Sequence, residues 1–145
     1  MEFDYVVVGA GSAGCAVASR LSQCGNYSVA LIEAGPDDNN PWIHVPVGYF
    51  RTMGNPKSDW RYETQPDKGI AGRSIPWPRG RVMGGSSSTN GLLYVRGQPQ
   101  DFDIWSQLGC RGWSWEEVLP FFKRSENWDG VDETGLRGKD GPLSV

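Results

Sequence analysis

A glycine-rich turn between two apolar segments constrains the fold of this chain more than any other feature. The turn runs from Gly9 to Gly14, with glycines at its first, third and sixth positions. The β-branched run 5–8 before it is typical of a buried parallel strand. The small and apolar residues after it favour a helix that stops near Gly25-Asn26, and the apolar run 28–33 predicts a second strand. The chain therefore opens with a βαβ unit over residues 4–33, close to the usual length of about 30 residues.

The glycines of this turn suit a dinucleotide. The first permits the tight turn, the second lets a pyrophosphate approach the backbone, and the third lets the helix pack on the sheet. Ser12 and Ala13 lie at the helix N-terminus, where free N–H groups and the helix dipole favour a phosphate. Glu33 ends the second strand, where an acid meets the ribose hydroxyls and disfavours the 2′-phosphate of NADP. The predicted cofactor-binding residues of this unit are Gly9, Gly11, Ser12, Ala13, Gly14, Glu33 and Ala34. A nucleotide-free Rossmann-like fold with the same turn is the alternative.

Composition excludes several other classes. The net charge is −3 and no basic stripe is visible, so we expect no nucleic-acid partner. The three cysteines show no CxxC spacing, which favours a reducing compartment with free thiols, and Cys15 is expected to be a small core residue of the first helix. The acidic N-terminus does not resemble a signal peptide, and no apolar run is long enough to span a membrane. These features predict a cytoplasmic protein and leave peripheral membrane association open.

The rest of the chain is irregular. Residues 34–78 are rich in proline yet carry many aromatic residues, so we expect an ordered surface excursion with a short strand at 60–64. Short helices are predicted around 102–108 and from the capping box that begins at Ser114, and the last residues, 141–145, suggest the start of another strand. The predicted fold class is α/β: a Rossmann-like start, a Pro/Gly-rich excursion and short helices.

A second glycine-rich segment, 79–97, separates the possible cofactors. Its Gly84-Gly85-Ser86 predicts a turn into a helix that continues to Gly97. The sequence from Gly80 to Gly97 resembles the first signature of the glucose–methanol–choline (GMC) oxidoreductases, which are FAD enzymes. Residues 59–66 and 113–122 resemble further segments of that family, so the resemblance covers nearly the whole chain in the right order. It disfavours an NAD enzyme.

The resemblance implies where the flavin half of FAD lies. Two glycines let the backbone approach a flat ring, and Asn90 can hydrogen-bond its polar edge. Some family members attach FAD covalently through a histidine just before this asparagine, whereas this chain has Thr89 there, so we expect non-covalent FAD. The resemblance assigns Ser86, Asn90, Gly91 and Leu93 to the ribityl and isoalloxazine end, with Val82 nearby. Gly85, in the turn itself, is also predicted to bind the cofactor.

The resemblance also implies what residues 1–145 do not contain. The catalytic histidine pair of the family has no match in this sequence. His44 is the one histidine and is expected to have a surface or structural role, and no metal site is expected. We therefore interpret residues 1–145 as the N-terminal part of an FAD-binding domain, without the substrate domain and the C-terminal catalytic part. Alone, it is expected to fold poorly and to hold FAD weakly.

The expected activity of the complete enzyme is oxidation of a choline-like or other primary alcohol by hydride transfer to flavin N5. A lyase or other non-redox relative on the same scaffold, or an inactive fragment, are the alternatives. The substrate alcohol, the electron acceptor and the oligomeric state stay open.

Overall fold

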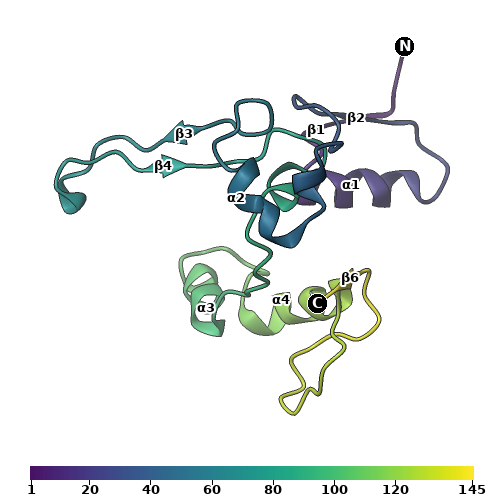
Figure 1. Cartoon of the computed structure of the whole chain (residues 1–145). Coiled ribbons are helices and arrows are strands. Elements are labelled where there is room, and N and C mark those ends of the chain that lie inside the picture. Colours follow the sequence, from purple (N-terminus) through teal and green to yellow (C-terminus); the bar gives the residue numbers. More distant parts are fainter. The chain divides into compact units, whose positions relative to one another are not determined.

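The computed structural model describes all residues from 1 to 145 and divides them into two compact units, Met1–Leu93 and Tyr94–Val145. Each unit combines helices with short strands, and the fold is mixed α/β, as predicted. Figure 1 labels these elements along the chain. No helix has both the length and the apolar character that crossing a membrane requires.

The first unit opens with the predicted βαβ arrangement. Strand β1 (Tyr5–Val8) pairs in parallel with β2 (Val29–Ile32), and helix α1 (Ser12–Ser22) connects them. This sheet has two strands, and its apolar side chains are only partly covered: Val8 is 82% exposed. The sheet and helix faces that a larger core would cover are open. For the same reason Cys15 is exposed, and its expected place in a core is wrong.

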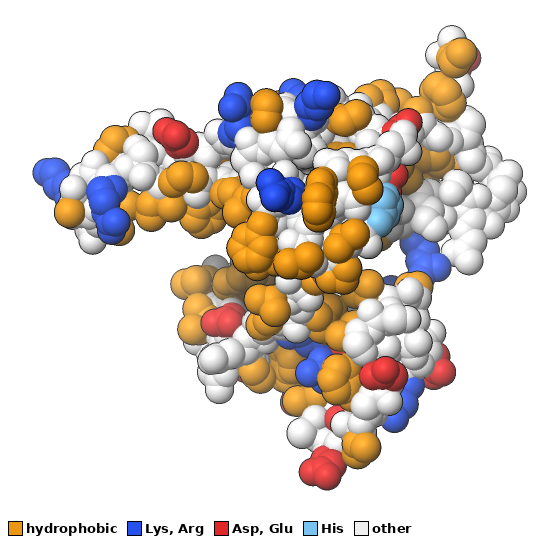
Figure 2. Space-filling model, in the orientation of Figure 1, with side chains coloured by type: hydrophobic (Ala, Val, Ile, Leu, Met, Phe, Trp, Pro, Cys, Tyr) orange, Lys and Arg blue, Asp and Glu red, His pale blue; other side chains and the backbone are white.

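The excursion after β2 is ordered, as expected. Short helical turns η1 (Pro41–Ile43) and η2 (Pro46–Gly48) lead into helix α2 (Tyr49–Thr52). Strands β3 (Tyr62–Glu63) and β4 (Pro76–Trp77) then form an antiparallel hairpin that carries the turn η3 (Lys68–Ile70). Figure 1 shows this hairpin as a long arm within the first unit, and Figure 2 shows hydrophobic side chains along it.

The helix predicted from Ser86 to Gly97 is wrong beyond its first turn. The structure has a single 3₁₀ turn, η4 (Gly85–Ser88), and no regular structure follows it until Pro99. The side chain of Asn90 accepts a hydrogen bond from the amide of Leu92 (3.0 Å), and Leu92 itself has a φ of 59°. A local side-chain bond and a left-handed residue both oppose helix continuation.

The second unit is built around two helices and a two-stranded contact. Helices α3 (Pro99–Gln107) and α4 (Trp115–Ser125) pack together, and β5 (Glu126–Asn127) pairs in parallel with β6 (Leu143–Ser144). The predicted capping box of α4 is present, because Ser114 and Glu117 exchange side-chain and backbone hydrogen bonds. Aromatic rings fill the space between the helices, with Phe102 against the rings of Trp105, Trp115 and Phe122. Phe102, at 7% exposed, is the one apolar side chain of this unit that is buried.

Candidate functional site

The two glycine turns, 75 residues apart in the sequence at Ser12 and Ser87, are in direct contact in the first unit. The amide of Gly84 donates to the carbonyl of Ala10 (2.9 Å), and the hydroxyls of Ser12 and Ser87 are hydrogen-bonded (3.1 Å). A Cβ added at Gly85 would lie 2.8 Å from the Cα of Gly11. The turns can approach this closely because both positions are glycine. The two motifs that were separate in the sequence therefore form one site.

The three glycines of the first turn have different surroundings. A Cβ at Gly14 would lie 1.9 Å from the carbonyl oxygen of Gly9, so this glycine is required for the close packing of α1 on the turn. A Cβ at Gly11 would meet nothing nearer than the Cα of Gly85 at 3.9 Å, and Gly9, with a φ of 94°, has open space around it. The backbone of Gly9 and Gly11 therefore offers an uncovered surface that a ligand can approach.

The N-terminus of α1 faces this open surface without a protein partner of its own. Gly11 is the N-cap residue, no side chain caps the helix, and its first turn has no acidic residue. Ser12 and Ala13 are exposed there. An eleven-residue helix with uncapped N–H groups places a partial positive charge at this end, which favours an anionic group.

Glu33 is held beside the same turn by backbone amides. The amide of Ala10 donates to its Oε2 (2.8 Å), and the amide of Gly35 donates to its Oε1 (2.9 Å). Each carboxylate oxygen can accept more than one hydrogen bond, so both remain able to accept from a hydroxyl group. The carboxylate is half-buried and its orientation is fixed before any ligand arrives.

These elements enclose a pocket of about 460 Å³ within the first unit. Six predicted residues line it: Gly9, Gly11, Glu33, Ala34, Gly85 and Ser86. The hydroxyl of Ser86 also accepts a hydrogen bond from the amide of Gly80 (3.0 Å), which fixes the second turn at the pocket wall. Backbone amides, a carboxylate and an uncapped helix end thus converge on one space.

Sequence reasoning missed three large side chains of this pocket. Trp60, Tyr62 and Arg79 line it together with the glycine turns. Trp60 and Tyr62 are two residues apart in the segment that the sequence predicted to be a strand, and this spacing was the available signal that both face one side. Arg79 directly precedes Gly80, but nothing in its local sequence shows that it reaches the first turn's pocket.

The other predicted residues lie outside this pocket's lining. Val82 is buried, with 1% of its surface exposed, and its carbonyl accepts a hydrogen bond from the amide of Gly85 (2.7 Å). Ser12 and Ala13 stand at the helix end beside the pocket, and Gly14 packs below the turn. Four residues were predicted for the ribityl and isoalloxazine end, and the structure does not bring them together in this pocket. Ser86 lines it, whereas the other three are exposed and lie outside its lining: Asn90, Gly91 and Leu93.

His44 has the surface position that its sequence context predicts. Its Nε2 lies 2.7 Å from the carbonyl oxygen of Asp38, and 59% of its side chain is exposed. No group of three or more metal-ligating side chains is found in the chain. The residues gathered at the pocket are suited to binding a ligand, and none of them is a paired acid and base.

Comparison with known proteins agrees with the family resemblance of the sequence. The family model described as GMC oxidoreductase matches residues 3–145. The chain belongs to the GMC oxidoreductase family. It is 50% identical over 145 residues to the oxygen-dependent choline dehydrogenase of Vibrio vulnificus, covering 99% of this chain and 26% of that protein. The chain therefore spans about a quarter of the length of the curated relatives that it matches.

Solved GMC structures share the fold of the chain. Pyridoxine 4-oxidase from Mesorbium loti superposes with a TM-score of 0.88 at 42% identity, over 99% of this chain and 28% of that one. A variant of Aspergillus oryzae formate oxidase, studied for FAD modification, superposes with a TM-score of 0.84 at 33% identity, over 98% of this chain and 26% of that one. The cofactor supported by the family is FAD, as the sequence predicted.

The pocket fits such a cofactor. Gly9 and Gly11 carry no side chain, so the space beside their backbone is left open for a ligand. The uncapped end of α1 matches a pyrophosphate, and the fixed carboxylate of Glu33 matches ribose hydroxyls. Arg79 adds a positive charge to the lining. The donor set is therefore chemically compatible with the adenosine diphosphate half of FAD.

Proposed function

We propose that residues 1–145 are the FAD-binding portion of an enzyme that oxidises a small alcohol. The observation that carries this proposal is the contact between the two glycine turns beside Glu33, which builds one pocket from two distant motifs. A turn that served only to begin a helix would need neither the open backbone at Gly11 nor a carboxylate held by two amides.

Each part of the site has a defined role in this proposal. Glu33 accepts hydrogen bonds from the ribose hydroxyls, and the amides of Ser12 and Ala13 bind the pyrophosphate. The second turn, at Gly85 and Ser86, supports the chain of the cofactor as it leaves the first turn. Val82, Asn90, Gly91 and Leu93 are assigned to the flavin end on the family resemblance, with Ala34 at the adenosine end.

Bound FAD would supply a two-electron acceptor, whose N5 takes the carbon-bound hydride of the alcohol. The hydroxyl proton would pass to a base outside residues 1–145, so that the alcohol would become an aldehyde. A choline-like primary alcohol is the proposed substrate because choline dehydrogenases are among the relatives at 50% identity. The exposed, unpaired thiols suit a reducing, cytoplasmic setting.

The proposal is tested by the flavin content of the complete protein. We expect a yellow protein with flavin absorbance that bleaches when choline or another primary alcohol is added without oxygen. The isolated segment 1–145 is expected to bind added FAD weakly, because its two-stranded sheet leaves apolar faces open. A well-folded complete protein with no flavin, and no affinity for added FAD, would refute the proposal.

Acid precipitation tests whether the FAD is attached. Thr89 has a hydroxyl and no ring nitrogen, so it cannot form the bond that a histidine makes at that position. We expect trichloroacetic acid to release all of the FAD into the supernatant, with the pellet colourless. Flavin that stays with the pellet after denaturation would show a covalent bond and contradict this prediction.

A further inference from the structure

A buried carboxylate outside the glycine turns organises one wall of the cofactor pocket. Asp59 is 5% exposed. Its Oδ1 accepts hydrogen bonds from the amides of Arg61 (2.8 Å) and Arg79 (3.0 Å), and its Oδ2 accepts from the amide of Gly54 (2.6 Å). One side chain therefore joins three stretches of backbone that are up to 25 residues apart, at Gly54 and Arg79.

The backbone that this carboxylate holds includes one strained residue, Arg61. Arg61 has a φ of 53°, a left-handed conformation that costs a non-glycine residue roughly 1–2 kcal/mol. The bond from its amide to Asp59 stabilises this turn. On either side of the turn, the rings of Trp60 and Tyr62 are stacked, with centroids 5.9 Å apart and planes 4° from parallel.

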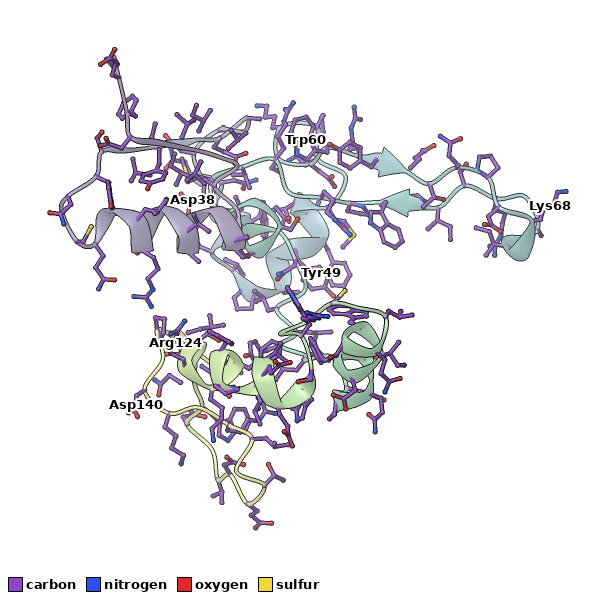
Figure 3. All side chains as sticks on the ribbon, turned by 180° about the vertical axis from the view of Figure 1, so that it is seen from behind. Asp38, Tyr49, Trp60, Lys68, Arg124 and Asp140 are labelled. Carbon is purple, nitrogen blue, oxygen red and sulfur yellow. The ribbon has the colours of Figure 1, made fainter.

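The backbone at Asp59 and Trp60 also pairs with the start of the second glycine segment. The amide of Trp60 donates to the carbonyl of Arg79 (2.9 Å), and the backbones of Asp59 and Gly80 form an isolated antiparallel β-bridge. The guanidinium of Arg81 lies over the ring of Trp60, 5.5 Å from its centroid. Figure 3 places Trp60 near the base of the hairpin arm, while Lys68 lies at its far tip.

We propose that Asp59 is a positioning residue, which holds Trp60 and Arg79 against the pocket and so sets the affinity for the adenosine diphosphate half of FAD. This rests on the proposed function. Trp60 and Arg79 line the pocket beside Glu33 and Gly9, the end assigned to adenosine diphosphate. A flat ring suits contact with the adenine or ribose. The guanidinium of Arg79 lies over the ring of Trp77 (5.2 Å) and uses Nη1 for the carbonyl of Pro78 (2.7 Å), which leaves its other nitrogens to donate to a phosphate.

The ionisation of Asp59 is consistent with this role. Burial raises the pKa of the carboxyl group. The amides of Arg61, Gly54 and Arg79 and the charge of Arg61 lower this pKa by more than burial raises it, so the net shift is downward. Asp59 thus stays an acceptor for all three amides at neutral pH. Its own oxygens are occupied by the protein, so it acts through the residues that it holds.

The test measures ADP and FAD binding to the complete apoprotein. Asp59→Asn turns one of the two oxygens into a donor, which opposes at least one of the three amides. We expect both ligands to bind about tenfold more weakly, which corresponds to about 1.4 kcal/mol. The matched control is Asp67→Asn at the tip of the hairpin, where the exposed side chain accepts one hydrogen bond, from the amide of Gly69 (2.6 Å). The amide oxygen of asparagine can still accept that bond, so ADP binding should be unchanged.

A double-mutant cycle separates positioning from a general structural effect. Trp60→Ala and Arg79→Ala should each weaken ADP binding several-fold. In a protein that carries both of these substitutions, adding Asp59→Asn should weaken ADP binding little further. Additive losses, or a folded Asp59→Asn protein that binds ADP normally, would overturn the proposal. If Asp59→Asn does not fold, unchanged ADP binding by both alanine variants overturns it instead. A wild-type protein that binds no FAD at all would refute the proposed function itself.

Discussion

Replacing Gly11 with alanine is expected to leave the protein folded and to remove most of its affinity for FAD. An added Cβ at Gly11 meets nothing closer than 3.9 Å in the protein, which is an ordinary contact, and the φ of this residue, −78°, suits alanine. The methyl group would instead occupy the space that a pyrophosphate needs. Losing charge-assisted hydrogen bonds of about 1.5–3 kcal/mol corresponds to a loss of binding of at least tenfold.

Gly14→Ala should behave differently because its role is packing. Its Cβ would lie 1.9 Å from the carbonyl oxygen of Gly9, and a backbone atom can yield only if the turn and helix α1 separate. We expect a loss of stability of about 3 kcal/mol, at the upper end of what overpacking costs, together with the loss of FAD binding. The two glycines of one motif are thus expected to separate: Gly11→Ala damages binding alone, and Gly14→Ala damages both.

Thermal unfolding of the apoprotein and FAD titration measure the two effects. Gly25→Ala is the control, because Gly25 lies in the turn after α1 with no atom within 4 Å of an added Cβ. Because Gly25 has a φ of 70°, alanine there should reduce stability by roughly 1–2 kcal/mol. It should leave the affinity for FAD unchanged. If Gly11→Ala bound FAD like the wild type, the open face of this turn would not be the pyrophosphate site.

The βαβ unit could be predicted from sequence because all its signals are local. A β-branched run, a glycine turn and helical spacing each specify the conformation of their own residues, and the parallel pairing of Tyr5 with Val29 follows from the connection. The glycine at position 14 was predicted to permit close packing, and the near contact with Gly9 confirms that. The core position expected for Cys15 failed because what covers a helix face is not a local property.

The second half of the site depended on contacts that sequence patterns do not record. The apolar run after Asn90 fits a helix by composition. The side chain of Asn90 instead accepts a hydrogen bond from the amide of Leu92, which opposes the helix. Trp60 and Arg79 line one pocket, and the carboxylate of Asp59 accepts hydrogen bonds from the amides of Arg61 and Arg79. No spacing in the sequence specifies that meeting. The family resemblance identified the segments correctly without giving their conformation.

Glu126→Gln is expected to destabilise the second unit more than any other change of a single charge. Glu126 is fully buried, its Oε1 accepts from Nη1 of Arg137 (2.8 Å), and its Oε2 accepts from Arg96 and from the amide of Gly138 (2.8 Å). Glutamine keeps the shape but points an NH₂ group at donors and leaves two guanidinium groups without their counter-charge. Breaking a buried pair in this way costs about 3–5 kcal/mol.

The ion cluster ties together the ends of the second unit, which explains why the loss should be large. Arg96 also donates to the carbonyl of Leu136 (2.6 Å) and lies over the ring of Phe122 (5.3 Å). Arg137 lies over the ring of Trp128 (4.6 Å). Without Glu126, the segment at Arg96, helix α4 and the loop before β6 lose their common partner. Local unfolding should therefore extend through residues 94–145.

The effect should depend on pH in a defined direction. Burial raises the pKa of Glu126, but the amide of Gly138 and the charges of Arg137 and Arg96 outweigh burial, and the pKa is lowered from its usual 4.5. A carboxyl group whose pKa is lower in the folded state contributes stability that is complete above its unfolded pKa and is lost as the pH falls through its folded pKa. The advantage of the wild type over Glu126→Gln should therefore shrink below about pH 4.5.

Hydrogen exchange of the complete protein can follow this unit by itself, through peptides that cover residues 94–145. At neutral pH, we expect Glu126→Gln to speed exchange in α4 by about a hundredfold or more, as a loss of about 3 kcal/mol implies. Glu133→Gln is the matched control, because Glu133 is exposed and the same change there should leave exchange unaltered. Asp132, whose pKa is lowered to about 2 mainly by the amide of Arg137, titrates in both proteins and cancels from their difference. Equal exchange in Glu126→Gln and Glu133→Gln would show that the buried carboxylate does not hold the unit together.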